Sequence, residues 1–168
     1  MLIDLGRIIH YDEAELPVDL DLTIEANELG DIVQKVEKPF HIKGQIRNVR
    51  DLLTFGGKIT GRFLVLCSRC NSEVWVDFEC GFDETILKQA DDAMSDGILV
   101  ENDAIDIKDA MISNIIVNLP IRYLCDKNCK GLCPSCGANL NIENCNCVHT
   151  QADERLLVLQ KLLDQDKL

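Results

Sequence analysis

The chain has 168 residues, 46% of them hydrophobic but only 5% aromatic, and a formal net charge of −12. This size suits one domain with a mainly aliphatic core. No apolar run approaches the roughly 20 residues that a membrane helix needs, and the acidic N-terminal stretch lacks the pattern of a secretory signal. We therefore expect a cytoplasmic protein without a membrane partner, whose nine cysteines bind metal rather than form disulfides.

The first half of the chain has the two-residue periodicity of β-strands. Residues 1–9 are expected to form an opening strand, and apolar and polar residues alternate from 18 to 24. The stretch 40–87 is the most regular and predicts three strands of an antiparallel meander. The sheet should be curved and barrel-like.

Two connections are expected to join these three strands. The pair Gly56-Gly57 is typical of a tight hairpin, which we place between the first and second strands. A short link at 68–72 would join the second strand to the third. Cys80 shares the apolar parity of the third strand, so we expect it to be a buried core thiol.

The second half predicts two helices around a cysteine-rich segment. Residues 89–104 are acidic and weakly patterned, which indicates an exposed loop. Apolar residues at i+4 spacing then predict a helix that Asp106 caps and Pro120 ends. The predicted fold is a single α+β domain over 1–168, with a mainly β body at 1–106, a helix at 107–120, a zinc-knuckle segment at 121–149 and a C-terminal helix at 150–168.

Charge is unevenly distributed along the chain. The window 38–72 holds seven basic residues and one acid, so its formal charge is +6 and the rest of the chain carries −18. Such asymmetry can mark a nucleic-acid contact surface, although a solvated basic sheet face is an equal alternative. The candidate RNA-binding residues in this window are Lys43, Arg47, Arg50, Lys58, Arg62 and Arg69.

The cysteine-rich segment has the spacing of a zinc site. Two residues separate Cys133 from Cys136, which lets both sulfurs bind one tetrahedral zinc ion. Gly137 follows and accepts the left-handed backbone of such a turn. The predicted primary ligands are Cys133, Cys136, Cys145 and Cys147, with Cys125 or Cys129 as substitutes and His149 as a lesser candidate.

A second CxxC motif, Cys67-Ser-Arg-Cys70, leaves three interpretations open. It can form a second tetrathiolate site with Cys125 and Cys129, it can be redox-active, or it can be a turn with two free thiols. Redox CxxC motifs usually open a helix whose N-terminus stabilises the thiolate, whereas strands are predicted on both sides here. The redox interpretation is therefore the weakest of the three.

The cysteine motifs resemble those of a known family. The run CKGLCPSCGANLN at 129–141, with Leu119-Pro120 and Cys125 before it and Cys145-Asn-Cys147 after it, resembles the C-terminal signature of the bacterial YceD family. Residues 155–162 (RLLVLQKL) resemble that family's closing helix, and Cys67-Ser-Arg-Cys70 resembles its internal C-x-R-C motif. The resemblance implies a non-enzymatic role in the accumulation of large-subunit ribosomal RNA. In this chain, we expect the zinc indicated by the cysteine spacing to hold the C-terminal tail in place rather than to perform chemistry.

Three functional hypotheses follow. The first is a factor for biogenesis of the large ribosomal subunit that contacts ribosomal RNA with its basic strands. The second is a zinc-containing module whose acidic regions hold a basic large-subunit ribosomal protein. The third, an enzyme such as a thiol oxidoreductase, has little support, because the three histidines form no metal-ligand motif and no phosphate-binding loop is present. We expect no catalysis and no small-molecule substrate.

Overall fold

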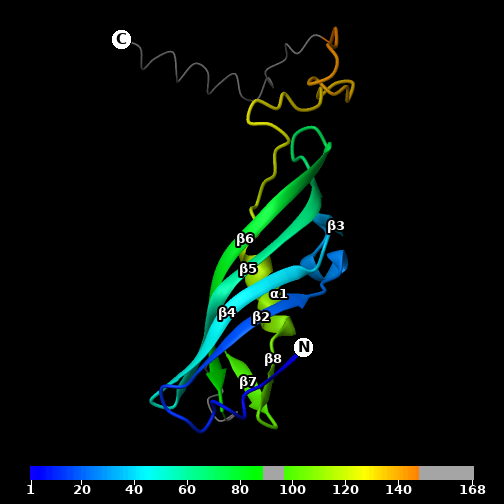
Figure 1. The fold of residues 1–168 in the computed structure, drawn as a ribbon. Coiled ribbons are helices and arrows are strands. Elements are labelled where there is room, and N and C mark those ends of the chain that lie inside the picture. The colour runs from blue at the N-terminus through cyan, green and yellow to red at the C-terminus, as the bar shows by residue number, and fades with distance from the viewer. Residues whose placement is uncertain (89–96, 148–168) are drawn as a thin grey trace, which may run out of the picture.

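A curved half-barrel sheet dominates the fold (Figure 1). The computed structural model describes residues 1–88 and 97–147, and in this part of the chain eight strands form one mixed sheet. Their order is β1-β8-β7-β6-β5-β4-β2, with β3 paired to β5. The strands are β1 (Leu2–Asp4), β2 (Glu15–Leu22), β3 (Val33–Val36), β4 (Phe40–Val49), β5 (Leu52–Leu66), β6 (Glu73–Leu87), β7 (Ile98–Glu101) and β8 (Ala104–Asp106).

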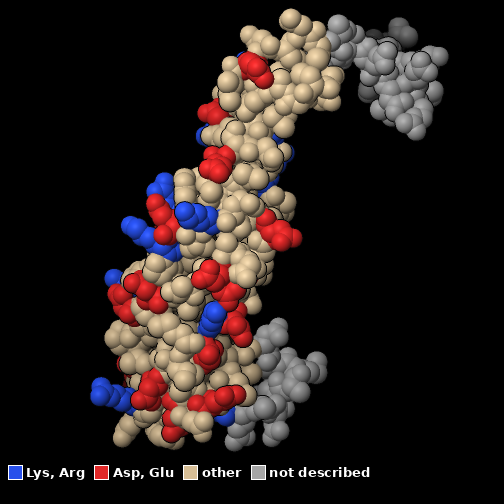
Figure 2. Space-filling model, turned by 90° about the vertical axis from the view of Figure 1, so that its right-hand side faces the viewer, with Lys and Arg blue, Asp and Glu red and all other residues tan. Residues whose placement is uncertain are grey.

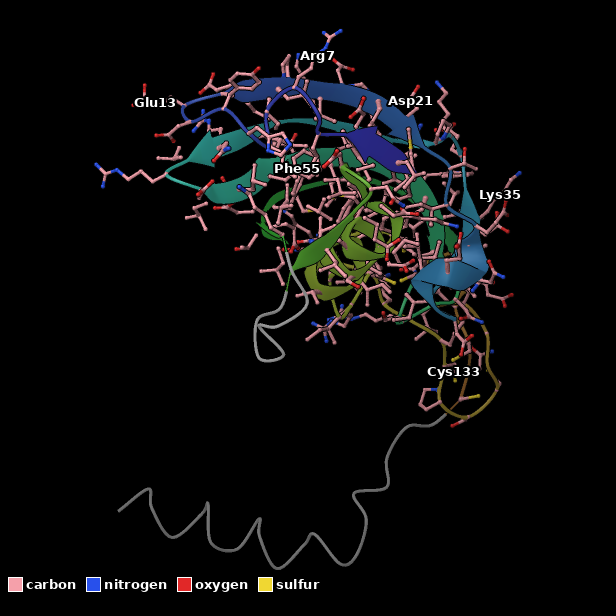
Figure 3. All side chains as sticks on the ribbon, turned by 90° about the horizontal axis from the view of Figure 1, so that it is seen from below. Arg7, Glu13, Asp21, Lys35, Phe55 and Cys133 are labelled. Atoms are coloured by element: carbon pink, nitrogen blue, oxygen red, sulfur yellow. The ribbon has the colours of Figure 1, made fainter. Side chains whose placement is uncertain are left out.

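The core lies inside the curve of the sheet, where every second residue of the long strands points inward. Phe55 and Phe82 meet edge to face with ring centroids 4.8 Å apart, and Phe63 packs in the same way against Tyr123 at 6.1 Å. Aliphatic residues fill the rest of this interior, as the composition predicts. Figure 3 shows the sheet wrapped around these side chains, with Cys133 far from them. Cys80 is buried in the same core, as expected.

The predicted hairpin at Gly56-Gly57 is wrong. The turn between β4 and β5 lies at Arg50 and Asp51, whose φ values of 52° and 67° are those of a two-residue hairpin loop. The two glycines lie within β5 because β4 and β5 approach closely there. A Cβ atom on Gly57 would stand 2.5 Å from the carbonyl oxygen of Lys43 on β4.

The predicted link at 68–72 joins β5 to β6, as expected. Two other predicted boundaries differ from the structure. The opening strand ends at Asp4, because the chain turns back after Leu5, whose carbonyl accepts hydrogen bonds from the N–H groups of Ile8 and Ile9. The expected loop at 89–104 contains β7 and part of β8, and β7 pairs in parallel with β6. The sheet is therefore mixed rather than wholly antiparallel.

One α-helix, α1 (Lys108–Asn118), is present among the described residues, together with a short 3₁₀ helix, η1 (Ala26–Leu29). Met111 and Ile115 face the core and are fully buried. The predicted cap is displaced by one residue, because Ile107 is the N-cap of α1 and makes no side-chain cap hydrogen bond. Asp106 lies just before it, and its carboxylate accepts a hydrogen bond from the N–H of Lys108 at 3.0 Å. The predicted helix at 150–168 lies outside the described residues. Among the described helices, none is long and apolar enough to span a membrane.

The β5–β6 hairpin extends beyond the other strands to form a tip (Figure 1). After α1 the chain runs back along this hairpin to its tip, where the backbone N–H of Ser68 donates to the carbonyl of Tyr123 at 2.8 Å. The hairpin link and the cysteine-rich segment thus meet although about fifty residues separate them in sequence.

Candidate metal centres

The first candidate centre lies at the tip of the β5–β6 hairpin. Cys67 and Cys70 bracket the turn there, and Asn71 adopts a left-handed φ of 60° that closes it. The N–H of Cys67 donates to the carbonyl of Ser72 at 2.8 Å, which fixes the backbone under both thiols. The link predicted from sequence is therefore also what positions the two sulfur atoms.

Cys125 and Cys129 complete this first tetrad. All four Sγ atoms lie within 4.8 Å of one another. The Sγ atoms of Cys67 and Cys129 are 3.8 Å apart, and those of Cys70 and Cys125 are 3.5 Å apart. A tetrahedral zinc ion with Zn–S bonds of about 2.3 Å requires sulfur–sulfur distances of about 3.8 Å, whereas a disulfide requires about 2.05 Å. The sulfurs therefore have the spacing of metal ligands.

Polar groups around the first tetrad suit deprotonated thiols. The side-chain amide of Asn141 donates to Sγ of Cys129 at 3.3 Å. Burial acts to raise the pKa of Cys67, but hydrogen bonds from backbone N–H groups, led by that of Arg69, lower it to about 6. The pKa of Cys125 rises to about 12 because its thiol shares hydrogen bonds with Cys70 and Cys129. Four such thiols cannot all be anionic without a cation between them, because their charges repel.

The second candidate centre contains Cys133, Cys136, Cys145 and Cys147, whose Sγ atoms also lie within 4.8 Å of one another. The N–H groups of Ser135 and Cys136 both point at Sγ of Cys133 at 3.4 Å. The N–H of Cys136 is the main reason that the pKa of Cys133 falls to about 6. Hydrogen bonds with Cys136 and Cys133 instead raise the pKa of Cys147 to about 12.

Local backbone geometry builds this second centre. Gly137 has a left-handed φ of 75°, and its N–H donates to the carbonyl of Cys133 at 2.9 Å. A short bridge between Leu132 and Asn139 then returns the chain. These contacts all fall within one short stretch, and all four cysteines of the second tetrad come from residues 133–147.

A short connection holds the two centres next to each other. The N–H of Leu132 donates to the carbonyl of Arg69 at 3.0 Å. Gly131 has a φ of 81°, and a Cβ atom there would stand 3.2 Å from the same carbonyl. The guanidinium of Arg69 in turn donates to the carbonyl of Cys129 at 2.8 Å. Arg69 thus joins the hairpin tip to the segment between the tetrads.

The structure brings together the primary ligand set predicted from sequence and, separately, the four cysteines of the alternative second site. Cys125 and Cys129 belong to the first tetrad, so they do not substitute for members of the second. His149 lies outside the described residues. Sequence reasoning missed Asn141 and Ser72, whose polar side chains lie beside the first tetrad. Their residue types alone gave no signal, because only the fold brings them to the thiols.

The six candidate RNA-binding residues are all exposed, but most have acidic or polar partners. Arg47 pairs with Glu15 at 3.3 Å and Lys58 with Glu79 at 2.8 Å. Arg62 lies between two carboxylates, 3.4 Å from Glu37 and 3.3 Å from Asp77. In the described part of the chain, Lys43 and Arg50 have no ion-pair partner. Figure 2 shows blue and red side chains interleaved along the face in view.

The outer face of the sheet is therefore mixed in charge. Strand pairing places the acidic strands β2 and β6 on either side of the basic strands β4 and β5. The positive window of the sequence thus meets acids that lie far away along the chain. On β2, β4, β5 and β6, the charged residues of this face are seven acids (Glu15, Asp19, Asp21, Glu73, Asp77, Glu79 and Asp83) and four cations (Lys43, Arg47, Lys58 and Arg62).

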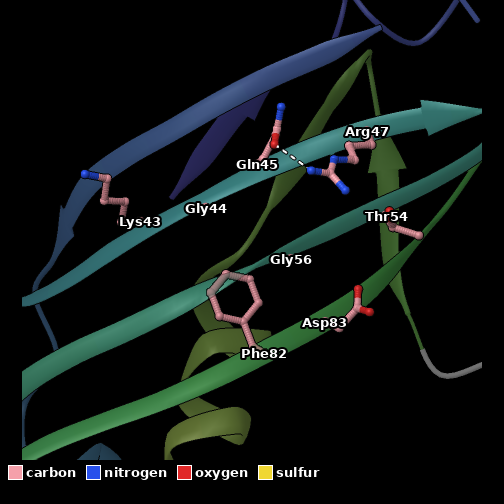
Figure 4. Close-up of a pocket in the computed structure, with 8 residues that line it drawn as sticks. All are labelled: Lys43, Gly44, Gln45, Arg47, Thr54, Gly56, Phe82 and Asp83. Atoms are coloured by element: carbon pink, nitrogen blue, oxygen red, sulfur yellow. Dashed lines mark hydrogen bonds between the residues drawn. The ribbon is translucent and has the colours of Figure 1, made fainter. Parts of the chain in front are cut away.

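A shallow hollow of about 480 Å³ lies on this outer face (Figure 4). It forms where Gly56 contributes no side chain, and Lys43 and Arg47 of β4 and Asp83 of β6 surround it. Arg47 is held by a hydrogen bond to the side-chain oxygen of Gln45 at 3.0 Å. Arg47 already pairs with Glu15, so Lys43 is the cation around the hollow that has no ion pair among the described residues.

Comparisons with known proteins agree with the motifs. The family model described as "Large ribosomal RNA subunit accumulation protein YceD" matches residues 55–163. The chain is 31% identical over 153 residues to "Uncharacterized protein YlbN" of Bacillus subtilis, covering 88% of this chain and 89% of that protein. It is also 36% identical over 61 residues to "Large ribosomal RNA subunit accumulation protein YCED homolog 1, chloroplastic" of Arabidopsis thaliana, covering 36% of this chain and 19% of that protein. No solved structure matches. On the family match over residues 55–163, which include both cysteine tetrads, the chain belongs to the YceD family.

Proposed function

We propose that this protein promotes the accumulation of large-subunit ribosomal RNA as a binding protein, without catalysis, and that zinc occupies the two cysteine tetrads. The observation that carries the role is membership of the YceD family, together with the name of the Arabidopsis relative. The identity of the metal is proposed from its ligands, because four thiolates favour zinc or an iron–sulfur cluster. The Sγ atoms of each tetrad lie within 4.8 Å of one another, which suits a single zinc ion rather than the wider spacing of ligands around a cluster.

The charge on the outer face supports a basic protein as the partner. Carboxylates outnumber cations by seven to four on β2, β4, β5 and β6, and the whole chain carries −12, so bare RNA phosphates would be repelled over most of the surface. A basic large-subunit ribosomal protein has the complementary charge. The protein would hold such a partner before it reaches ribosomal RNA.

Direct RNA contact is the second candidate, and one observation favours it. Lys43 borders the hollow on the outer face and has no ion pair within the described residues. If RNA binds there, Lys43→Glu should weaken binding more than Lys58→Glu, because Lys58 is already neutralised by Glu79. Equal RNA binding by wild type and both variants would remove this candidate.

A thiol oxidoreductase is the least supported alternative. Cys67 and Cys70 lie at a strand-to-strand link rather than at a helix N-terminus, and two further thiols lie beside them. A catalytic zinc needs an open coordination position. Both tetrads instead offer four sulfur ligands each, which is the arrangement of closed structural sites.

The proposed role is tested in a bacterium whose own family gene is deleted. The ratio of large-subunit to small-subunit ribosomal RNA is measured with and without this chain supplied from a plasmid. We expect the ratio to fall on deletion and to recover with the wild type. In parallel, the purified full chain is mixed with purified large-subunit ribosomal proteins at moderate salt. No change in the RNA ratio would refute the role, and retention of no basic ribosomal protein would refute the mechanism.

A further inference from the structure

Among the described residues, no strand pairs with one edge of β6 along most of its length. Strand β6 pairs with β5 from Glu73 to Ile86, but on its other side β7 pairs only with Ile86 and Leu87. In the ranges 1–88 and 97–147, no backbone hydrogen bond reaches this edge between residues 73 and 83. Figure 1 shows β6 as the border of the upper sheet. Unpaired N–H and C=O groups of this kind form a template for another strand.

The register identifies which residues offer these groups. In an antiparallel pair, alternate residues direct both backbone groups toward the partner strand. The N–H of Cys67 donates to the carbonyl of Ser72, the residue just before β6. The even-numbered residues of β6 therefore direct their backbone N–H and C=O groups toward β5. The N–H of Glu37 donates to the carbonyl of Arg62, which agrees with this parity on β5. The free groups of β6 therefore belong to the odd-numbered residues Glu73, Trp75, Asp77, Glu79, Gly81 and Asp83.

The side chains of these same residues set the chemistry of the edge. Four of the six are acidic and exposed, and they lie on the outer face. Asp77 and Glu79 already pair with cations of β5, whereas Glu73 and Asp83 have no ion pair among the described residues. Basic side chains on an added strand would lie directly beside this column, where opposite charges stabilise a cross-strand pair.

The inner side of the edge is apolar. Asn114 of α1 donates to the carboxylate of Glu84, which shows the side of α1 that faces β6. Val117 lies one turn further along that side and is 82% exposed, and Ile121 beyond the helix is fully exposed. An added strand could cover both residues with its alternate apolar side chains.

We propose that the open edge of β6 binds an extended segment of a partner protein in which Lys or Arg alternates with Val or Ile. This inference rests on the proposed function and specifies where and how the basic partner is held. Two other occupants fit less well. A second copy of this chain would place its acidic β6 column against the same column, where like charges repel. The chain's own residues 148–168 lack a strictly alternating basic pattern.

The test uses the full chain loaded with zinc and a synthetic probe, acetyl-Lys-Val-Arg-Ile-Lys-Val-Arg-Ile-Lys-amide. Hydrogen exchange of backbone amides is measured with and without the probe. We expect the amides of Trp75, Asp77, Glu79 and Gly81 to exchange rapidly in the free protein and to slow at least about tenfold when the probe is bound. The amides of the even-numbered residues between them should be slow throughout. Slow exchange of the odd-numbered amides in the free protein would overturn the proposal, because it would mean that the edge is already covered.

Matched variants separate backbone pairing from charge attraction. Gly81→Pro removes one N–H from the open edge, where proline is tolerated, and Gly81→Ala retains it. Loss of one such hydrogen bond, worth about 1 kcal/mol, should weaken binding of the probe about fivefold in Gly81→Pro, with little change in Gly81→Ala. Equal binding by both variants would overturn the proposal, since the contact would then be electrostatic alone.

Charge reversal gives the second control. Glu73→Lys with Asp83→Lys should reduce binding of the probe at least about tenfold. The control is Asp31→Lys with Glu101→Lys, which changes the net charge equally at exposed sites elsewhere. It should change binding of the probe less than about twofold. Similar losses from the two pairs would overturn the proposal. Retention of a basic ribosomal protein without protection of the β6 amides would refute this binding site and leave the proposed function standing.

Discussion

The two tetrads should differ sharply in their effect on the stability of the sheet. The first tetrad joins the β5–β6 hairpin to the segment after α1, whereas all ligands of the second come from 133–147. Two double variants compare them: Cys125→Ala with Cys129→Ala, and Cys145→Ala with Cys147→Ala. Each removes two ligands and abolishes one tetrahedral site.

The expected difference follows from the loop that each centre closes. Cys70 and Cys125 lie 55 residues apart in sequence, and a cross-link over such a loop removes chain entropy worth about 4 kcal/mol from the unfolded state. The second tetrad encloses no part of the sheet. We therefore expect the first variant to lower the free energy of unfolding of the sheet by about 4 kcal/mol, and the second to leave it within about 0.5 kcal/mol.

The chain reports on this directly through its single tryptophan. Trp75 lies on β6 near the hairpin tip, with the guanidinium of Arg62 5.7 Å from its ring centre. Urea unfolding is followed by tryptophan fluorescence and by circular dichroism, with excess zinc and a reducing agent present. Equal losses in both variants, or no loss in the first, would refute the cross-linking role of the first tetrad.

Three further outcomes are expected from single substitutions. Asn48→Ala should cost about 1–3 kcal/mol in thermal unfolding, because its buried side-chain amide donates a hydrogen bond to the carbonyl of Ile8 at 2.9 Å. Asn48→Asp should not restore the loss, because a carboxylate has no N–H to donate. Gly57→Ala should cost about 1–3 kcal/mol because its Cβ would overlap the backbone of β4, whereas Gly56→Ala, whose Cβ would lie 3.6 Å from the nearest atom, should be nearly neutral. The hydrogen bond from Lys108 lowers the pKa of Glu28, so Glu28 stabilises the fold above its ordinary pKa of 4.5 and loses this effect as the pH falls through the lowered value. The stability difference between wild type and Glu28→Gln should therefore shrink as the pH falls below 4.5, and a difference that grows instead would contradict the pairing.

Local patterns in the sequence were informative where the structure is local. The spacing of Cys133 and Cys136, followed by a glycine, indicated a metal site because one tight turn builds it. The two-residue periodicity likewise predicted the long strands. The partner of Cys67 and Cys70 stayed open, because only the return of the chain after α1 brings Cys125 to the hairpin tip.

The errors have the same physical origin. A Gly-Gly pair is a strong hairpin signal, but here the close approach of β4 to β5 requires Gly57. The turn instead uses Arg50 and Asp51 in left-handed backbone conformations, which this pair of residue types does not indicate in a sequence. The positive window of the sequence likewise suggested a positive face. Neighbours across a sheet come from distant positions, and Glu15 and Glu79 neutralise cations that a count along the chain leaves unpaired.

Eight of the nine cysteines should form two separate metal centres. Native mass spectrometry of the purified full chain, kept under reducing conditions, counts the bound ions directly. We expect two zinc ions per wild-type chain, one after Cys125→Ala with Cys129→Ala, and one after Cys145→Ala with Cys147→Ala. A wild-type chain that binds no metal, or a single ion that either double variant abolishes, would contradict it.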